Sequence, residues 1–312
     1  MVITVSFFKE IFSKNIRLNI PLLENKGHEI FMKREDLIHP IISGNKFRKL
    51  KYNIKEIKNK KLKLVTFGGA FSNHLLAVAY ISKIEKIKAI GIVRGEELHN
   101  FKLNPTLKKC IDYGMKLKFV SRDEYRLRHE KKYLEKLISK HSNAYIIPEG
   151  GTNEFGVKGC EEILNSNDID YFDTICVPVG SGGTISGIIN SSSSKQKILG
   201  FSSLKKSNIR VQINKFVNKN NYKIIDENYF GGYAKFNSQL VDFINEFYYN
   251  HEIKLDPIYN SKMIFRILND LRSNKWNYGK KILLINTGGL QSIDGFNKRL
   301  KEKKCATIDF TF

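Results

Sequence analysis

The chain has 312 residues, of which 41% are hydrophobic and 27% charged, a balance that suits a globular protein of one large or two modest domains and excludes a mostly disordered or collagen-like chain. No apolar run approaches the roughly 18 residues that a membrane-spanning helix needs, and Lys9, Glu10 and Lys14 interrupt the N-terminal segment, so we expect neither a membrane span nor a secretory signal. The net charge of +22 would suit nucleic acid, but the lysines recur along the whole chain without a basic tail, which favours a generally Lys-rich composition over a nucleic-acid site.

Strands and helices are expected to alternate through the first two thirds of the chain. Apolar stretches that end in glycine or a polar residue predict strands at 61–69, 88–95, 115–121, 143–151 and 173–180. Amphipathic patterns between them predict helices at 74–86, 105–114, 124–141 and 157–166. Such alternation is typical of a mainly parallel sheet with helices on both faces.

The pattern after residue 190 is less regular. Residues 191–197 predict a polar loop or a frayed helix end, followed by a strand at 197–203. Helices are predicted at 211–223, 237–252 and 261–276, and a last strand at 279–289. The last 20 residues have no interpretable pattern. Since no linker divides the chain, we expect any second domain to form where the chain leaves and re-enters one sheet.

The four cysteines are far apart and form no C-x-x-C pair, so a zinc knuckle or a dithiol redox site is not expected. In a chain without an export signal they are most simply reduced thiols of a cytoplasmic protein. They are Cys110, Cys160, Cys176 and Cys305.

Four glycine-bearing turns follow predicted strands. They lie at 66–74, 148–156, 179–187 and 286–292. Because ligands of open parallel sheets bind at the carboxyl ends of the strands, four such turns favour a small-molecule site over simple turn chemistry.

The turn at 179–187 is the most informative of the four. Its small residues are Gly180, Ser181, Gly182, Gly183 and Thr184. The glycines allow a ligand to approach the backbone, and the N–H groups and dipole of the following helix favour an anion, phosphate above all. No Gly-Lys-Ser/Thr follows, and Ile185 occupies the third glycine position of G-x-G-x-x-G, which disfavours a nucleoside triphosphate or a dinucleotide. The alternative is a tight strand–helix turn without a ligand.

A basic cluster lies at 43–53, where Lys46 follows Gly44 and Asn45. By charge alone this would be a solvated helix face. A lysine amine can also form a Schiff base with a carbonyl, and neighbouring cations lower its pKa and free the amine.

Together these segments resemble a known family. The sequence contains MKREDLIHPIISGNKFRKLKYN, FGGAFSNH, IPEGGTNEFGVKGCEEI and VPVGSGGTISGII, in that order, within a match from about residue 20 to about 290. It resembles the D-cysteine desulfhydrase / 1-aminocyclopropane-1-carboxylate (ACC) deaminase family of pyridoxal 5'-phosphate (PLP) enzymes. The resemblance implies an α/β fold with two open, mainly parallel twisted sheets in two domains, the tryptophan synthase β-like PLP fold type II. The larger, PLP-binding domain would comprise 1–49 and 156–312, and the smaller, inserted domain 50–155.

The resemblance also assigns the cofactor residues. Lys46 would hold PLP covalently, Asn45 would shape the site and Lys49 would bind the cofactor phosphate. Helical spacing places Lys46 and Lys49 on one side of a helix, which is consistent with both facing one cofactor. The phosphate cup would be the small residues of 180–184, in agreement with the anion site predicted above.

Substrate residues follow from the same resemblance. Ser72 would contact the substrate and assist proton transfer, Asn73 would support the phosphate or the ring hydroxyl, and His74 completes this turn. Tyr259 and Tyr233 match two tyrosines near the substrate, although both could be core aromatics whose hydroxyls find a partner.

The ring edge of the cofactor carries one departure from the family. Thr287 would line this edge near the pyridine nitrogen. ACC deaminases have a glutamate directly after the tyrosine that Tyr259 matches, whereas this chain has Asn260. A carboxylate would hold the ring nitrogen protonated, which a neutral amide does less well. Ring opening demands more of the electron sink than elimination of sulfide does.

The sequence therefore predicts a PLP-dependent lyase that converts D-cysteine to pyruvate, sulfide and ammonia, with Lys46, Ser72 and Tyr259 as catalytic residues. The alternatives are an ACC deaminase that forms 2-oxobutanoate, a family member without turnover and, in another class, a basic nucleic-acid-binding protein. We expect a small amino acid as substrate, a homodimer, no metal and a cytoplasmic location.

Overall fold

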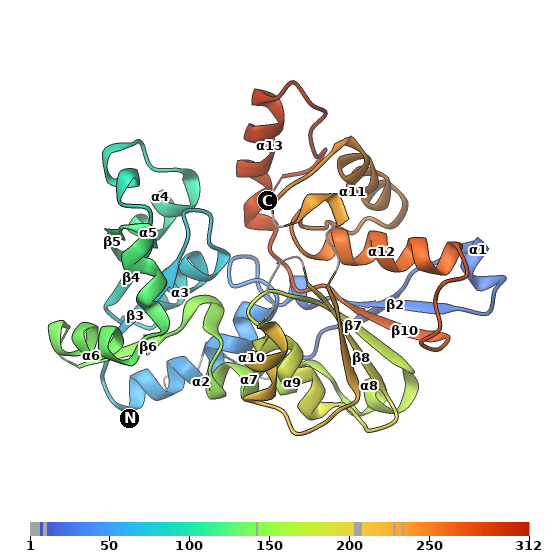
Figure 1. Ribbon diagram of the computed structural model, residues 1–312, viewed down its shortest axis with the longest axis horizontal. Coiled ribbons are helices and arrows are strands. Elements are labelled where there is room, and N and C mark those ends of the chain that lie inside the picture. Colours follow the sequence, from blue (N-terminus) through green and yellow to red (C-terminus); the bar gives the residue numbers. More distant parts are fainter. Residues whose placement is uncertain are drawn as a thin grey trace.

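The computed structural model describes residues 7–8, 11–141, 143–202, 208–226, 229–232 and 234–311. Two sheets form the framework (Figure 1): a six-stranded sheet in the order β1-β2-β10-β7-β8-β9 and a four-stranded sheet in the order β5-β4-β3-β6. All neighbouring strands run parallel except β1 and β2, which are antiparallel. The predicted mainly parallel α/β architecture is confirmed.

The larger sheet takes its strands from both ends of the chain. They are β1 (Asn15–Arg17), β2 (Glu29–Lys33), β7 (Thr174–Val179), β8 (Lys197–Ser202), β9 (Tyr222–Asp226) and β10 (Lys281–Ile285). The smaller sheet is continuous in sequence and comprises β3 (Lys63–Gly68), β4 (Ala89–Arg94), β5 (Lys116–Val120) and β6 (Ala144–Ile147). The chain thus leaves the larger sheet after β2 and re-enters it at β7. The domain boundaries at 49/50 and 155/156 stay a proposal.

Helices surround both sheets (Figure 1). Those before β7 are α1 (Pro21–Glu24), α2 (Asn45–Asn59), α3 (Asn73–Ile84), α4 (Pro105–Asp112), α5 (Arg122–Arg126), α6 (Lys131–Lys140), α7 (Glu154–Cys160) and α8 (Ser166–Tyr171). Those after it are α9 (Gly183–Ser191), α10 (Ile209–Asn214), α11 (Ser238–His251), α12 (Asn260–Arg272) and α13 (Ile293–Glu302). No helix in the described part of the chain is long and apolar enough to cross a membrane.

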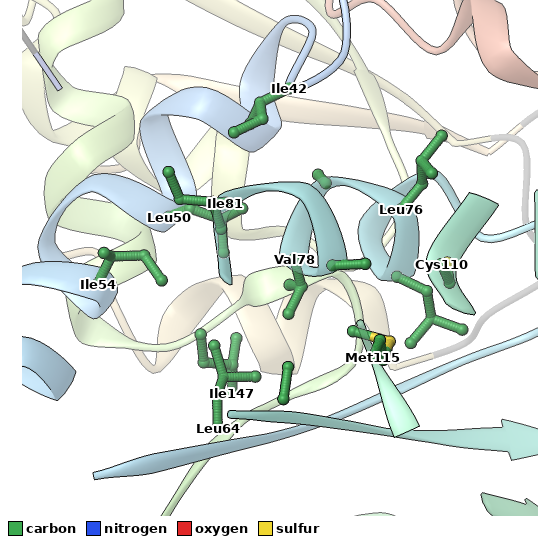
Figure 2. Close-up of a cluster of buried hydrophobic side chains, with 14 of the residues drawn as sticks. Ile42, Leu50, Ile54, Leu64, Leu76, Val78, Ile81, Cys110, Met115 and Ile147 are labelled. Atoms are coloured by element: carbon green, nitrogen blue, oxygen red, sulfur yellow. The ribbon is translucent and has the colours of Figure 1, made fainter. Parts of the chain in front are cut away.

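Helix α2 is anchored by one apolar face. Phe47, Leu50, Ile54 and Ile57 follow the spacing of a single helical stripe, and all are buried. Figure 2 shows Leu50 and Ile54 of this stripe in the cluster that α3 and the smaller sheet complete. Burial of each such side chain stabilises the fold by about 1.5–3 kcal/mol. This packing fixes the start of α2, where the basic cluster lies.

The predicted helix at 124–141 is wrong as a single element. It is broken into α5, a 3-10 turn and α6, because the backbone of Glu130 is extended (φ −85°, ψ 129°). Tyr125 is buried and donates its hydroxyl to Glu149, and Arg128 donates to the other carboxylate oxygen. These long-range contacts turn the chain where the sequence pattern alone favours a continuous helix.

The predicted helix at 211–223 is also wrong in its second half. Helix α10 ends at Asn214, and 222–226 form β9, which pairs with β8 at the edge of the larger sheet. Asn221 starts this strand by donating to the carbonyls of Ser193 and Gln196. Two shorter differences remain: the helix predicted at 157–166 is α7, which spans 154–160, and part of the last 20 residues forms α13. The polar loop predicted at 191–197 is confirmed between the end of α9 and the start of β8.

Candidate active site

The glycine turns meet at the carboxyl ends of the strands. Gly44 has φ +61°, and a Cβ there would lie 1.9 Å from the carbonyl oxygen of Thr287, so the turn before α2 packs directly on the turn after β10. A Cβ on Gly289 would lie 3.3 Å from Asn73 Nδ2, and one on Gly180 would lie 3.3 Å from the Tyr259 hydroxyl. Segments far apart in sequence are thereby joined in one site, which glycine permits by its missing side chain.

Lys46 lies in the first turn of α2, partly buried at this junction. Its Nζ donates to Asn45 Oδ1 at 2.8 Å, and Asn45 Nδ2 donates to Thr184 Oγ1 at 2.9 Å. Asn45 therefore links the amine to the start of α9. Removal from water, and secondarily the Lys49 ammonium, lower the pKa of Lys46 to about 7. Near neutral pH a large fraction of this amine is unprotonated and can act as nucleophile or base.

Lys49 lies one turn along α2 in a pocket of neutral oxygens. Its Nζ donates to the Gly150 carbonyl at 3.0 Å, to Thr152 Oγ1 at 3.1 Å and to Ser181 Oγ at 3.4 Å, and the two hydroxyls are 2.6 Å apart. A Cβ on Gly183 would lie 2.8 Å from Thr152 Oγ1 and 3.2 Å from Lys49 Nζ, so this position is open only because it is glycine.

These groups form a cradle for an anion. The lysine charge, two hydroxyls and the start of α9 converge where the sequence predicted a phosphate cup. Gly182, with φ +90°, directs the chain from β7 into the helix. Thr152 was missed by sequence reasoning, although its glycine turn at 148–156 was singled out.

Asn260 and Thr287 are brought together, but the amide of Asn260 is fully used by the protein. Its Nδ2 donates to Asp256 Oδ1 at 2.6 Å and to the Gly288 carbonyl at 2.9 Å, and its Oδ1 accepts from the Thr287 N–H at 3.1 Å. Asp256 also accepts the N–H groups of Ile258, Tyr259 and Asn260. Burial raises the pKa of the Asp256 carboxyl, which these hydrogen bonds oppose. Asp256 was not among the predicted site residues, although it lies three residues before Tyr259.

The turn at 72–74 caps α3. Ser72 Oγ accepts the N–H of Leu75 at 3.2 Å, which leaves the hydroxyl proton free to donate elsewhere. Asn73 Nδ2 donates to the Gly289 carbonyl at 3.3 Å, and its buried Oδ1 has no hydrogen-bond partner among the described residues.

His74 is a neutral imidazole. Its Nε2 lies 2.8 Å from Thr66 Oγ1, whose hydroxyl donates to the Ile147 carbonyl at 2.8 Å. Nε2 must therefore carry the proton, which leaves Nδ1 as a buried acceptor without a partner in the described structure. Burial, together with Lys46 and Lys49, lowers the pKa of His74 well below 6.5.

Tyr259 precedes α12, with its hydroxyl beside Gly180, whereas Tyr233 lies outside the described residues. Lys262, one turn into α12, was missed by sequence reasoning. Its buried Nζ donates to the carbonyls of Gly232 at 2.6 Å and Lys235 at 2.9 Å, on either side of residue 233. Lys262 thus ties this segment to the helix that follows Tyr259. Its position three residues after the tyrosine is the one signal that could have found it.

The residues present fit PLP. A lysine amine with a pKa of about 7 suits attachment of an aldehyde, and the Lys49 cradle, with the glycine that keeps it open, suits a phosphate ester. The unpartnered Asn73 Oδ1 and His74 Nδ1 are acceptors that a bound molecule could satisfy.

Comparison with known proteins agrees with this chemistry. Residues 17–213 match the family described as pyridoxal-phosphate dependent enzyme. A Thermotoga maritima protein, provisionally assigned as an ACC deaminase, is 32% identical over 89% of this chain and 94% of its own. The mitochondrial bifunctional D-cysteine desulfhydrase/ACC deaminase of Arabidopsis thaliana is 31% identical over 88% of this chain and 75% of its own.

A solved structure confirms the fold. The crystal structure of an ACC deaminase homologue superposes with a TM-score of 0.78 at 25% identity, covering 94% of both chains. The predicted fold type, family and cofactor class are thereby confirmed. The chain belongs to the pyridoxal-phosphate dependent enzymes, in the family of the D-cysteine desulfhydrases and ACC deaminases.

Proposed function

We propose that the protein catalyses β-elimination on a small amino acid, with D-cysteine as the first choice of substrate. One D-cysteine and one water would give pyruvate, hydrogen sulfide and ammonia. The reaction breaks the Cβ–S bond after loss of the α-proton. PLP, when bound, supplies the electron sink for the carbanion.

The residues have separate tasks in this proposal. Lys46 holds the cofactor and, when released, accepts the α-proton, which its pKa of about 7 favours near neutrality. Asn45 keeps the Lys46 amine in place. Lys49, Thr152 and Ser181 bind the cofactor phosphate.

The substrate face of the site is assigned in the same way. Ser72, which keeps a hydroxyl proton to donate, assists proton transfer at the substrate, and Asn73 and His74 offer acceptors beside it. Tyr259 lines the site next to the phosphate cup. Tyr233 keeps its place in the proposal as a second substrate residue.

The observation that carries the choice of substrate is the state of Asn260. Its amide is neutral and committed to Asp256, Gly288 and Thr287, and Asp256 is itself occupied by the 258–260 turn. No carboxylate is thus free in this turn to keep the pyridine nitrogen protonated. ACC ring opening, which starts without an α-hydrogen, needs that stronger sink more than sulfide elimination does.

ACC deamination is the second candidate, because relatives at 31–32% identity are assigned this activity. The test is turnover of the PLP-loaded protein with D-cysteine, L-cysteine and ACC, with sulfide, pyruvate and 2-oxobutanoate measured separately. We expect sulfide and pyruvate from D-cysteine, and no turnover by Lys46→Ala. 2-Oxobutanoate from ACC as the dominant product would favour the second candidate, and sulfide release by Lys46→Ala would refute the assignment of Lys46.

A binding role for the charge of +22 belongs to a different class of function. A nucleic-acid-binding role predicts that the protein binds any DNA in a salt-dependent way and that the protein shows no visible chromophore. A homodimer and a cytoplasmic location are also part of the proposal. The sedimentation mass of the PLP-loaded protein tests the homodimer.

A further inference from the structure

Phe71 connects the smaller sheet with α13, next to the turn that carries Ser72. It precedes Ser72 in the turn between β3 and α3, and its side chain is 51% exposed. Its ring nevertheless packs on Gly295 of α13. A Cβ on Gly295 would lie 2.9 Å from Phe71 Cε1 and 3.1 Å from Cδ1. In Figure 1, α13 stands between α11 and the helices of the smaller sheet.

The turn that carries Phe71 is held on its other side by α4. Asn104 caps this helix by accepting the Leu107 N–H at 3.0 Å, and its Nδ2 donates to the Ala70 carbonyl at 3.0 Å. Phe71 and Gly295 also line a small cavity of about 10 Å³ together with Pro105 and Thr106 of α4. A change at this contact is therefore passed to the turn.

Ser72 and Asn73 depend on the same turn. Ser72 starts α3, and Asn73 reaches across to the Gly289 carbonyl in the turn after β10. A displacement of Phe71 would move both relative to Lys46, which is fixed by α2. The large aromatic ring of Phe71 fits against α13 because residue 295 is a glycine without a side chain.

We propose that Phe71 and Gly295 form the contact that sets the spacing between the smaller sheet and α13, with Phe71 as a positioning residue for Ser72 and Asn73. The kinetic part of this inference rests on the proposed function. The spacing itself does not.

The main test is Gly295→Ala. Alanine is a better helix former than glycine, so an effect on α13 alone would leave the melting temperature unchanged or higher. The added Cβ would push the Phe71 ring away, and misplacement of up to about 1 Å can cost on the order of 100-fold in kcat/KM. We expect kcat/KM to fall about 10- to 100-fold without a lower melting temperature. Phe71→Leu in the same chain should restore most of the loss, and Lys298→Ala on the exposed face of α13 is the control.

A distance measurement separates this inference from the proposed function. Cys305 is the exposed native cysteine, and a second spin label can be placed on the exposed α6 position by Lys132→Cys. Labelled protein diluted in unlabelled protein is measured by double electron–electron resonance. The distance should increase with Gly295→Ala, return with Phe71→Leu added, and broaden with Phe71→Ser in the native background.

The outcomes are distinct. An unchanged distance in both Gly295→Ala and Phe71→Ser would overturn the inference, whatever the kinetics, and so would a kcat/KM loss that Phe71→Leu does not reverse. Shifted and restored distances in a protein that turns over none of the tested amino acids would support the inference while the proposed function fails.

Discussion

The pKa of Lys46 is the most direct electrostatic consequence of the site. Burial lowers it from 10.5 to about 7, with the Lys49 ammonium as the second cause. At pH 7 about half of the amine is then unprotonated, compared with about 0.03% for an ordinary lysine, a difference of roughly 1,000-fold in the reactive form. Lys49→Met removes the neighbouring charge but not the burial. We expect this substitution to raise the pKa of Lys46, though not to its ordinary value.

Competitive labelling of the PLP-free protein measures this pKa. Trace acetic anhydride is applied across pH 5–11, and acetylation of the Lys46 peptide is read by mass, with exposed lysines of the same digest as reference. The reactivity of Lys46 should rise with pH and level off above about 7, since only the unprotonated amine reacts. Lys51→Met is the matched control, because Lys51 lies on the same helix as Lys46 but its charge is paired with Glu162. A midpoint above pH 9 in the native protein, or one that Lys49→Met lowers, would refute the reasoning.

Three further predictions concern the surroundings of Lys46. Gly44→Ala should prevent folding or cost more than about 4 kcal/mol in urea unfolding, because its Cβ would lie 1.9 Å from the Thr287 carbonyl oxygen. The control is Gly114→Ala, which is also at positive φ but in open space and should cost only about 1–2 kcal/mol. Equal costs for the two substitutions would contradict the close approach at Gly44. Lys49→Met should weaken PLP binding by about 10- to 100-fold in a fluorescence titration, because a charge-assisted contact is lost, and unchanged affinity would place the phosphate elsewhere. Asp256→Asn should lower the free energy of unfolding by about 1–3 kcal/mol, since one acceptor of the 258–260 turn becomes a donor, and an unchanged urea midpoint would show that the turn does not depend on the carboxylate.

The fold was predictable where local pattern and tertiary contacts agree. The strands that became β3, β4 and β7 are continuous apolar runs that end at a glycine or polar turn, and such runs are buried in parallel sheets. The break at Glu130 and strand β9 were not predictable, because contacts with Glu149 and with β8 decide them. Local preference alone favours helices in both places.

The site shows the same division. Lys46 and Lys49 could be found from their motif and helical spacing, and the turn at 180–184 from its glycines. Thr152 and Asp256 could not, because each acts through partners that only the fold brings near, and Lys262 had only its spacing from Tyr259 as a signal. A buried carboxylate or ammonium is recognisable only from its hydrogen-bond partners.

The central claim is that Lys46 carries PLP. The most direct measurement is the visible absorbance of the PLP-loaded protein before and after sodium borohydride, with the reduced pyridoxyl group located by peptide mass. The account predicts a visible band that borohydride removes, a pyridoxyl group on the Lys46 peptide, and neither signal in Lys46→Ala. A pyridoxyl group on Lys49 or elsewhere, or no band with saturating PLP, would contradict it.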